Sequence, residues 1–329
     1  MSTVGTKATI ATREYDFVAP LALGEVTADG VDLRVLRAFD ALRRFAGDAS
    51  MEGGEASFSQ YLRRIASGDR SLVGLPVFIM REFRHRCFFV RRGGDMTDVT
   101  HLRGRRIGTD TWGASGNTWS RAILRGAGVP LDGIRWFVGP VNAGDAPADT
   151  ASLPAGVSPT PGGRALGEML LAGELDALMV PWPPRGFDAP ASRIRRLYED
   201  YRTVEREYYR RTRIYPGHHV IVLRRAFAER HPAAVGAIYR AFVRSREVSE
   251  HYHRVLHETS PWVLADLEEQ SALMGPEFRP YGYRENRAMV AAFCEEQLAQ
   301  GLIREPLDPD ALFSDFELLT AGGAAGRGG

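Results

Sequence analysis

The sequence contains very little lysine, and this scarcity narrows the chemistry that the chain can perform. Lys7 is the only lysine among 329 residues, and we expect it to lie in a polar N-terminal tail. Schiff-base chemistry and catalysis with pyridoxal phosphate normally require a buried lysine. The sequence therefore argues against both. Arginine carries nearly all of the positive charge, and its planar guanidinium suits bidentate binding of carboxylates.

Cysteine is almost as scarce. The two cysteines, Cys87 and Cys294, are too few for a structural zinc site or a disulfide framework. Cys87 opens an apolar run, which indicates a core residue rather than a nucleophile. His253 and His257 are spaced to share a helix face, but the surrounding sequence lacks a zinc-protease pattern. We therefore expect a solvated helix there and no metal site.

Long apolar segments and an excess of charge of one sign are also missing. No stretch approaches the ~20 apolar residues of a membrane span, and the N-terminus shows no export-signal pattern. A formal net charge of +1 creates no overall field that would recruit nucleic acid. We expect a cytoplasmic protein without a membrane or nucleic-acid partner, while association into a homo-oligomer stays open.

Strand-like apolar segments alternate with amphipathic helix-like segments, which is typical of an α/β fold. The length favours two lobes over one. A Gly-rich stretch over residues 52–57 predicts a turn. Strands are predicted near residues 31–36, 75–79, 87–90, 135–138, 176–180 and 220–223, and residues 102–109 are predicted to be a short loop running into a strand. C-terminal helices are predicted near residues 233–246, 262–269, 284–300 and 308–319.

The strand pattern also predicts where the lobes divide. We expect one lobe to comprise residues 1–101 and 217–329, with the second lobe, residues 102–216, inserted between them. Residues 139–163 are rich in Pro, Ala and Gly, which predicts a flexible loop or a lid. We expect residues 322–329 to form a disordered tail.

Several short motifs follow one another in a fixed order. Residues 76–85 read Pro-Val-Phe-Ile-Met-Arg-Glu-Phe-Arg-His, and residues 55–62 read Glu-Ala-Ser-Phe-Ser-Gln-Tyr-Leu. From Tyr15 to Phe313 the series resembles the 4,5-dihydroxyphthalate decarboxylase family. Further matching pieces lie at residues 102–108, 173–177, 261–262, 281–287 and 296–302.

Three segments depart from the family's pattern. Residues 215–219 read Tyr-Pro-Gly-His-His where the family usually has Phe-Pro-x-Met-His, so only the final histidine, His219, matches. Residues 110–117 are richer in glycine than in the family, and residues 139–163 look expanded. These departures bear on the substrate more than on the fold.

The resemblance implies a periplasmic-binding-protein-like (type II) fold, with two lobes, a ligand cleft between them and C-terminal helices. It also implies a cofactor-independent, non-oxidative decarboxylase of a hydroxylated aromatic, phthalate-like acid. Two alternatives stay open. One is a solute-binding protein for a small anionic ligand without catalysis, and the other is a related enzyme acting on another aromatic acid in secondary metabolism.

Candidate binding residues follow from where ligands bind in open α/β sheets, which is beyond the carboxyl ends of strands and near helix N-termini. Residues 55–60, 110–118 and 181–185 fit this description. As an alternative, the polar side chains could serve only to cap helices, and the aromatic side chains could pack in the core. The candidates for substrate binding are Ser57, Ser59, Thr111, Trp112, Ser115, Asn117 and Trp182.

Arg81, Arg84 and His85 interrupt two apolar runs, which predicts a strand junction facing the cleft. Two arginines can hold two carboxylates, and a histidine can act as general acid near neutral pH. The alternative is a surface ion-pair cluster with Glu82.

A second histidine pair, His218 and His219, precedes a predicted strand, where neighbouring side chains point to opposite faces. We favour His219 for the cleft because it matches the family position. Decarboxylation by protonation of the ring carbon requires an acid and a base. The acid is His85 or His219, and the base is the other histidine or Glu55.

Overall fold

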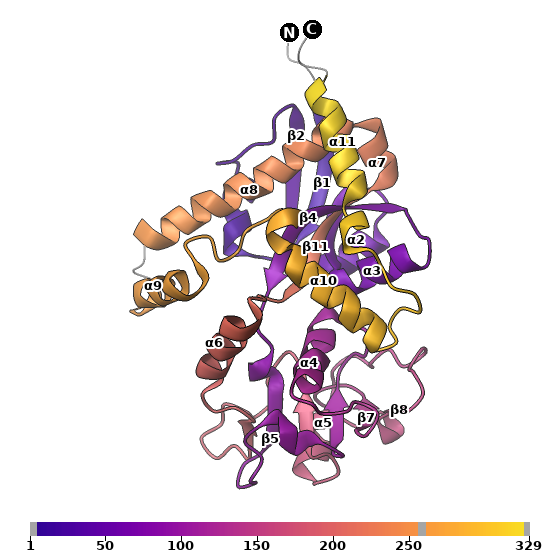
Figure 1. Cartoon of the computed structure of the whole chain (residues 1–329), viewed down its shortest axis with the longest axis vertical. Coiled ribbons are helices and arrows are strands. Elements are labelled where there is room, and N and C mark those ends of the chain that lie inside the picture. Colours follow the sequence, from indigo (N-terminus) through magenta and orange to yellow (C-terminus); the bar gives the residue numbers. More distant parts are fainter. Residues whose placement is uncertain (1–4, 256–260, 326–329) are drawn as a thin grey trace. The chain divides into compact units, whose positions relative to one another are not determined.

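The computed structural model describes residues 5–255 and 261–325, and the chain divides into two compact units (Figure 1). Each unit has its own sheet and its own hydrophobic core. Unit 1 comprises Met1–Arg81, Gly217–Cys294 and Glu305–Gly329, and unit 2 comprises Glu82–Pro216 and Glu295–Arg304.

Unit 1 contains a five-stranded sheet in the order β2-β1-β3-β11-β4. β1 is parallel to both β2 and β3, whereas β11 is antiparallel to β3 and β4. The beginning of β11 therefore lies beside the carboxyl ends of β3 and β4. The strands are β1 (Thr6–Thr12), β2 (Val31–Arg37), β3 (Gly53–Ser57), β4 (Leu72–Arg81) and β11 (Gly217–Arg224).

Both faces of this sheet are buried. Val77 and Ile79 of β4 join the core formed with α8, which runs across the strands beside α11 in Figure 1. Phe78, between them, faces the other way and meets Phe58 and Phe313 at ring-centroid distances of 5.4 and 5.7 Å. The helices of unit 1 are α1 (Ala19–Ala22), α2 (Ala41–Gly47), α3 (Phe58–Ala66), α7 (Arg225–Arg230), α8 (Pro232–Val255), α9 (Val263–Met274), α10 (Tyr283–Ala299, whose last residues belong to unit 2) and α11 (Ser314–Ala325).

The predicted turn over residues 52–57 is wrong, because this stretch forms strand β3. A Cβ atom on Gly53 would lie 2.7 Å from the carbonyl oxygen of Val222, and one on Gly54 would lie 2.5 Å from the ring of Phe45. The two glycines therefore allow neighbouring elements to approach the strand closely, rather than reversing the chain.

Unit 2 contains a six-stranded mixed sheet in the order β10-β5-β9-β6-β7-β8. β6 is parallel to β7 and β9, β7 is parallel to β8, and β5 is antiparallel to β9 and β10. Its strands are β5 (Phe88–Arg91), β6 (Arg106–Thr109), β7 (Arg135–Val138), β8 (Val157–Pro159), β9 (Ala177–Met179) and β10 (Ile194–Arg196), and its helices are α4 (Ser115–Gly126), α5 (Leu166–Leu171) and α6 (Tyr201–Thr212).

Alternating residues of β5 supply two cores in unit 2. Phe88 packs with Leu124 and Trp136 on one face of the sheet. Phe89 packs with Met169 on the other face. This alternation, with apolar residues on both sides, explains why the strand reads as a continuous apolar run.

The observed division differs from the predicted one at its first boundary and near the C-terminus, where residues 295–304 belong to unit 2 rather than to the first lobe. β5 pairs with β9 and β10, so residues 82–101 belong to unit 2 rather than to the first lobe. In the predicted loop 139–163, residues 157–159 form strand β8 at the sheet edge. α11 extends to Ala325, into the predicted tail, and residues 326–329 lie outside the described residues, as does His257. Lys7, predicted in a tail, is an exposed residue of β1.

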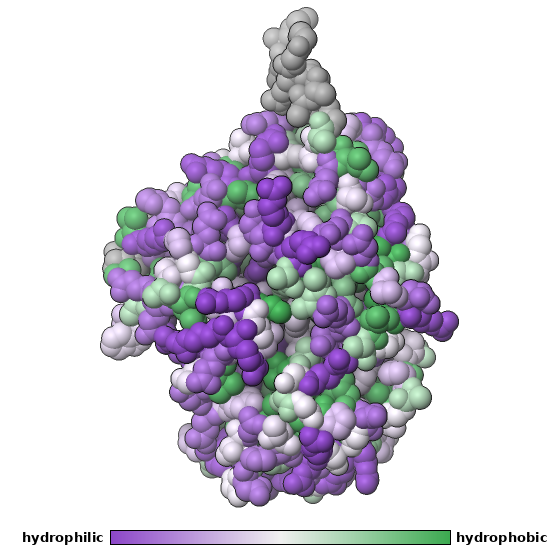
Figure 2. Space-filling model, viewed as in Figure 1, coloured by the Kyte–Doolittle hydropathy of each residue, from purple (hydrophilic) through white to green (hydrophobic). Residues whose placement is uncertain are grey.

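The surface seen in Figure 2 is mostly hydrophilic, with apolar side chains in small separate patches. Within the described residues, no helix combines the length and the apolarity needed to cross a membrane.

Candidate functional site

A carboxylate–histidine pair lies at the carboxyl edge of the sheet in unit 1. Ser57 of β3 pairs with His219 of β11, and Glu55 pairs with Ile221. This register brings Glu55 diagonally beside His219, so that Oε1 of Glu55 lies 2.5 Å from Nδ1 of the imidazole. Glu55 is fully buried, whereas the His219 side chain keeps 12% of its surface exposed.

The surroundings of Glu55 stabilise its charged form. The backbone N–H of Arg13 donates to Oε2 at 2.7 Å, and the Tyr15 hydroxyl donates to Oε1 at 2.7 Å. Burial by itself would raise the pKa of Glu55, but the hydrogen bond and charge of His219, together with these two donors, lower it. The carboxylate is therefore ionised at neutral pH and holds the imidazole through Nδ1, which leaves Nε2 as the other ring nitrogen.

Tyr15 takes part as a donor only. Burial raises the pKa of its hydroxyl strongly, and the neighbouring Glu55 charge raises it further. The phenol therefore stays protonated and holds the carboxylate oxygen that also contacts His219.

The other predicted residues of unit 1 have structural partners. Ser57 caps α3 by accepting a hydrogen bond from the Gln60 N–H at 3.5 Å, and Ser59 is buried within the same helix. Arg81 ends β4, donates to the carbonyl oxygen of Pro280 at 3.0 Å and hydrogen-bonds Asn286. Its guanidinium therefore ties β4 to the C-terminal segment.

In unit 2, Arg84 is buried in a polar cluster rather than presented to solvent. Only 2% of its side chain is exposed, and its Nη1 lies 2.9 Å from a carboxylate oxygen of Glu82. Nη2 donates to Asn117 and Nε to Ser120, both at 3.4 Å. This arrangement matches the ion-pair alternative, although the cluster is buried and not on the surface.

Asn117 links Arg84 to the loop after β6. Its amide donates to Asp110 at 2.9 Å and to the carbonyl oxygen of Thr111 at 2.7 Å. Burial raises the pKa of Asp110, while Asn117 and the Arg84 charge act in the opposite direction. Ser115 is buried at the start of α4, and the Thr111 side chain is exposed. The predicted loop thus forms one network around Arg84.

His85 is poorly suited to donate protons near neutral pH. The ring is 3% exposed and lies among Tyr198 and Tyr208, with centroids 6.0 and 5.1 Å away. Burial, and secondarily the charge of Arg211, lower the pKa of His85 to about 4. This environment argues against His85 as the general acid, one of the two histidines predicted for that role.

The low pKa of His85 predicts a pH-dependent stability. An unfolded histidine, with its usual pKa of 6.5, gains a proton as the pH falls, whereas folded His85 stays neutral down to about 4. The free energy of unfolding should therefore fall by about 2 to 3 kcal/mol between about pH 7.5 and 4.5 through this residue alone. His85→Gln should remove this component in urea titrations at both pH values.

An exposed histidine of unit 2, His101, provides the control for that experiment. His101→Gln should leave the pH dependence of the wild-type protein intact. Equal pH dependence in the wild-type and His85→Gln proteins would show that folded His85 titrates normally.

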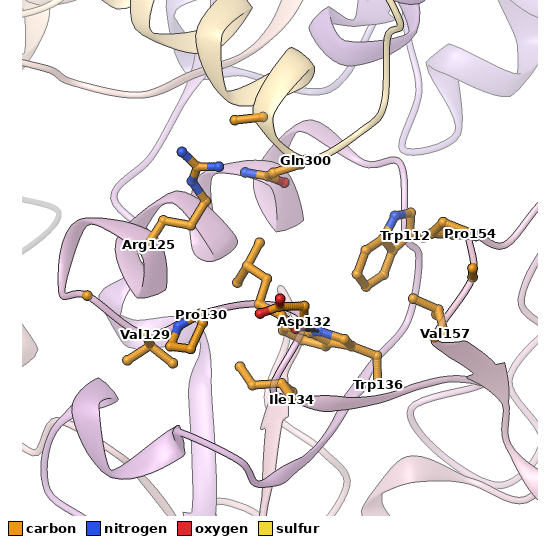
Figure 3. Close-up of a pocket in the computed structure, with 15 residues that line it drawn as sticks. Trp112, Arg125, Val129, Pro130, Asp132, Ile134, Trp136, Pro154, Val157 and Gln300 are labelled. Atoms are coloured by element: carbon orange, nitrogen blue, oxygen red, sulfur yellow. Dashed lines mark hydrogen bonds between the residues drawn. The ribbon is translucent and has the colours of Figure 1, made fainter.

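The two predicted tryptophans of unit 2 lie in different surroundings. Trp182 follows β9 and is 53% exposed. Trp112 and Trp136, with ring centroids 5.4 Å apart, line a pocket of about 750 Å³, and Arg125 lies on the opposite side of it (Figure 3). The Arg121 guanidinium covers the Trp112 ring at 4.0 Å. Trp112 therefore packs within unit 2.

Metal-ligating side chains do not gather in the part of the chain that the structure describes, where no three His, Cys, Asp or Glu residues converge. His253, from the predicted histidine pair, instead lies with Nε2 3.0 Å from a carboxylate oxygen of Asp16.

The sequence is similar to those of known decarboxylases. A 4,5-dihydroxyphthalate decarboxylase of Comamonas testosteroni is 32% identical over 321 residues, which cover 94% of this chain and 96% of the relative. The chain belongs to the 4,5-dihydroxyphthalate decarboxylase family. A member of this family from Pseudomonas putida is 30% identical over 207 residues, covering 61% of this chain and 80% of that protein. No family model matches the chain. The predicted family is confirmed, and it is a family of carboxy-lyases.

Solved structures similar to this decarboxylase-family chain show its fold. The periplasmic aliphatic sulphonate binding protein SsuA from Escherichia coli aligns with a TM-score of 0.53 and 14% identity, over 93% of this chain and 96% of SsuA. The desulfurization enzyme DSZB aligns with a TM-score of 0.52 and 15% identity, over 98% and 100% of the two chains. The predicted α/β fold of the periplasmic-binding-protein type is confirmed.

Sequence reasoning missed Arg13 and Tyr15, which hold Glu55. The resemblance to the family begins at Tyr15, and this was the signal in the sequence that could have pointed to Tyr15. The preceding strand, β1, was not predicted because its residues, Thr6–Thr12, mix small, polar and charged side chains.

Proposed function

We propose that this chain catalyses the non-oxidative decarboxylation of a hydroxylated, phthalate-like aromatic acid. His219 would donate the proton to the ring, and Glu55 would act as the residue that positions His219. The proposal is supported by membership of the decarboxylase family and by one observation above all, the buried Glu55 carboxylate on Nδ1 of a partly exposed histidine.

The proposed reaction exchanges carbon dioxide for a proton. Direct loss of CO₂ would leave an unstable aryl anion, so protonation of the carboxylate-bearing carbon comes first. Nε2 of His219 gives its proton to that carbon, and a hydroxyl para to it supplies electrons to the ring. The C–C bond to the carboxylate then breaks, its electron pair restores the aromatic ring, and CO₂ leaves. No oxidant or reductant is consumed.

Glu55 has a defined task in this scheme. The hydrogen bond from the imidazole to Glu55 engages Nδ1 and keeps Nε2 as the position that gives the proton. After CO₂ leaves, His219 is neutral and takes a proton from water for the next turnover. Tyr15 and the Arg13 N–H keep Glu55 in its ionised form.

A substrate panel tests this function. The purified protein is incubated with 4,5-dihydroxyphthalate, 4-hydroxyphthalate and phthalate, with and without a chelator, and CO₂ is measured. We expect release from the two acids that carry a hydroxyl para to a carboxylate, and none from phthalate, because phthalate has no hydroxyl to stabilise the protonated ring. Tight binding of all three acids without CO₂ would instead favour the solute-binding alternative.

A further inference from the structure

Two arginines lie at the ends of neighbouring strands, on the carboxyl edge of the sheet in unit 1. β1 and β2 are parallel, and Arg37, the last residue of β2, pairs with Thr12, the last residue of β1. Arg13 follows Thr12 directly. Both arginines therefore lie at the carboxyl ends of adjacent strands, which is where open α/β sheets bind ligands.

Both arginines lack an acidic partner within residues 5–255 and 261–325. Arg13 donates from Nη1 to the sulfur of Met80 at 3.8 Å, and Arg37 donates from Nη2 to the carbonyl oxygen of Tyr15 at 3.2 Å. The Nε–H groups of Arg13 and Arg37 and the hydroxyl of Thr12 are buried and have no hydrogen-bond partner among these residues. Such buried donors are unfavourable unless an acceptor is supplied.

The Glu55 carboxylate, which the Arg13 backbone contacts, is already engaged by other donors. Glu55 already accepts from His219, Tyr15 and the Arg13 backbone. Arg84 offers a contrast, because Glu82 neutralises it. The cluster at the strand ends therefore holds two cations and a hydroxyl with no anion assigned to them.

The cluster is also tied to the proposed acid–base pair. Arg13 holds Glu55 through its backbone, and Arg37 holds the backbone of Tyr15, whose hydroxyl contacts Glu55. The exposed ring of Phe39 lies 6.0 Å from the Arg13 guanidinium and adds an apolar surface beside it. Met80, which Arg13 contacts, pairs with His219 between β4 and β11, and this links the arginine to the histidine.

We infer that Arg13 and Arg37, with Thr12, form a subsite for two adjacent carboxylates on an aromatic ring. A guanidinium binds a carboxylate through two parallel N–H donors, so two arginines match an ortho-dicarboxylate. This inference rests on the proposed function for the identity of the ring, and it replaces Arg81 and Arg84 as the predicted carboxylate anchors.

Calorimetric titration with phthalate and benzoate tests the subsite separately from catalysis, because neither acid carries a hydroxyl. We expect wild-type protein to prefer phthalate. Arg13→Gln and Arg37→Gln should each weaken phthalate binding by roughly 10- to 100-fold. Arg34→Gln, an exposed arginine of the same β2 strand, should bind phthalate like wild type. Arg13→Lys and Arg37→Lys, which keep the charge, should recover part of the affinity, and circular dichroism confirms folding.

The outcomes separate the subsite from the reaction. If both glutamine variants bind phthalate as tightly as Arg34→Gln, or wild type does not prefer phthalate to benzoate, the subsite is wrong, even where CO₂ release from 4,5-dihydroxyphthalate is observed. If phthalate binding requires both arginines but no substrate of the panel yields CO₂, the subsite stands and the proposed reaction fails.

Discussion

Replacing His219 with asparagine should lower kcat for CO₂ release by roughly 100- to 10,000-fold, the usual contribution of general acid–base catalysis. Asparagine can hydrogen-bond Glu55 but cannot transfer a proton near neutral pH. KM should change much less, because the proposed carboxylate contacts belong to Arg13 and Arg37. Steady-state kinetics on 4,5-dihydroxyphthalate separate the two parameters.

His218 provides a matched control on the same strand. It is buried at the neighbouring position of β11, whereas the histidine held by Glu55 is His219. His218→Asn, with its rate normalised to folded protein, should keep kcat within a few fold of wild type. A His219→Asn protein that retains the wild-type kcat would remove the imidazole from the chemical step.

The second large effect concerns stability. Arg84→Met should lower the free energy of unfolding by about 2 to 3 kcal/mol, because it removes charge-assisted contacts inside unit 2 while Glu82 keeps Arg86 as a partner. The loss has three sources in the structure, because Arg84 contacts Glu82, Asn117 and Ser120 inside unit 2. Urea denaturation followed by tryptophan fluorescence reports on this unit, which contains Trp112, Trp119, Trp136 and Trp182.

A surface ion pair of the same unit serves for comparison. Arg164 and Glu174 lie 2.7 Å apart with side chains 44% and 43% exposed. Arg164→Met should cost at most about 1 kcal/mol, because solvent screens exposed pairs. If Arg84→Met were no less stable than Arg164→Met, and mainly raised KM, Arg84 would be a substrate anchor, as its sequence position first indicated.

The sequence predicts much of the fold because local patterns determine it. The apolar run at residues 87–90 and the segment 135–138 form strands β5 and β7, within a residue or two of the predicted bounds. The sheet to which β5 belongs was not predictable in this way. Assignment to unit 2 depends on pairing with β9 and β10, which lie about 90 to 110 residues further along the chain.

The candidate site is less predictable for the same reason. Glu55 and His219 are 164 residues apart, and only the antiparallel register of β3 and β11 brings them together. His85 looked suitable as an acid because it interrupts two apolar runs, which predicted a strand junction facing the cleft. Its burial among tyrosines, which lowers its pKa to about 4, comes from the packing of α6 and cannot be read from the neighbouring residues.

The central claim is that this chain protonates and decarboxylates an aromatic acid. The most direct measurement is the mass spectrum of the product that wild-type protein forms from 4,5-dihydroxyphthalate in D₂O. We predict 3,4-dihydroxybenzoate carrying one deuterium at the ring carbon that lost its carboxylate, together with an equal amount of CO₂. Recovery of unchanged 4,5-dihydroxyphthalate, bound or free, would contradict the claim.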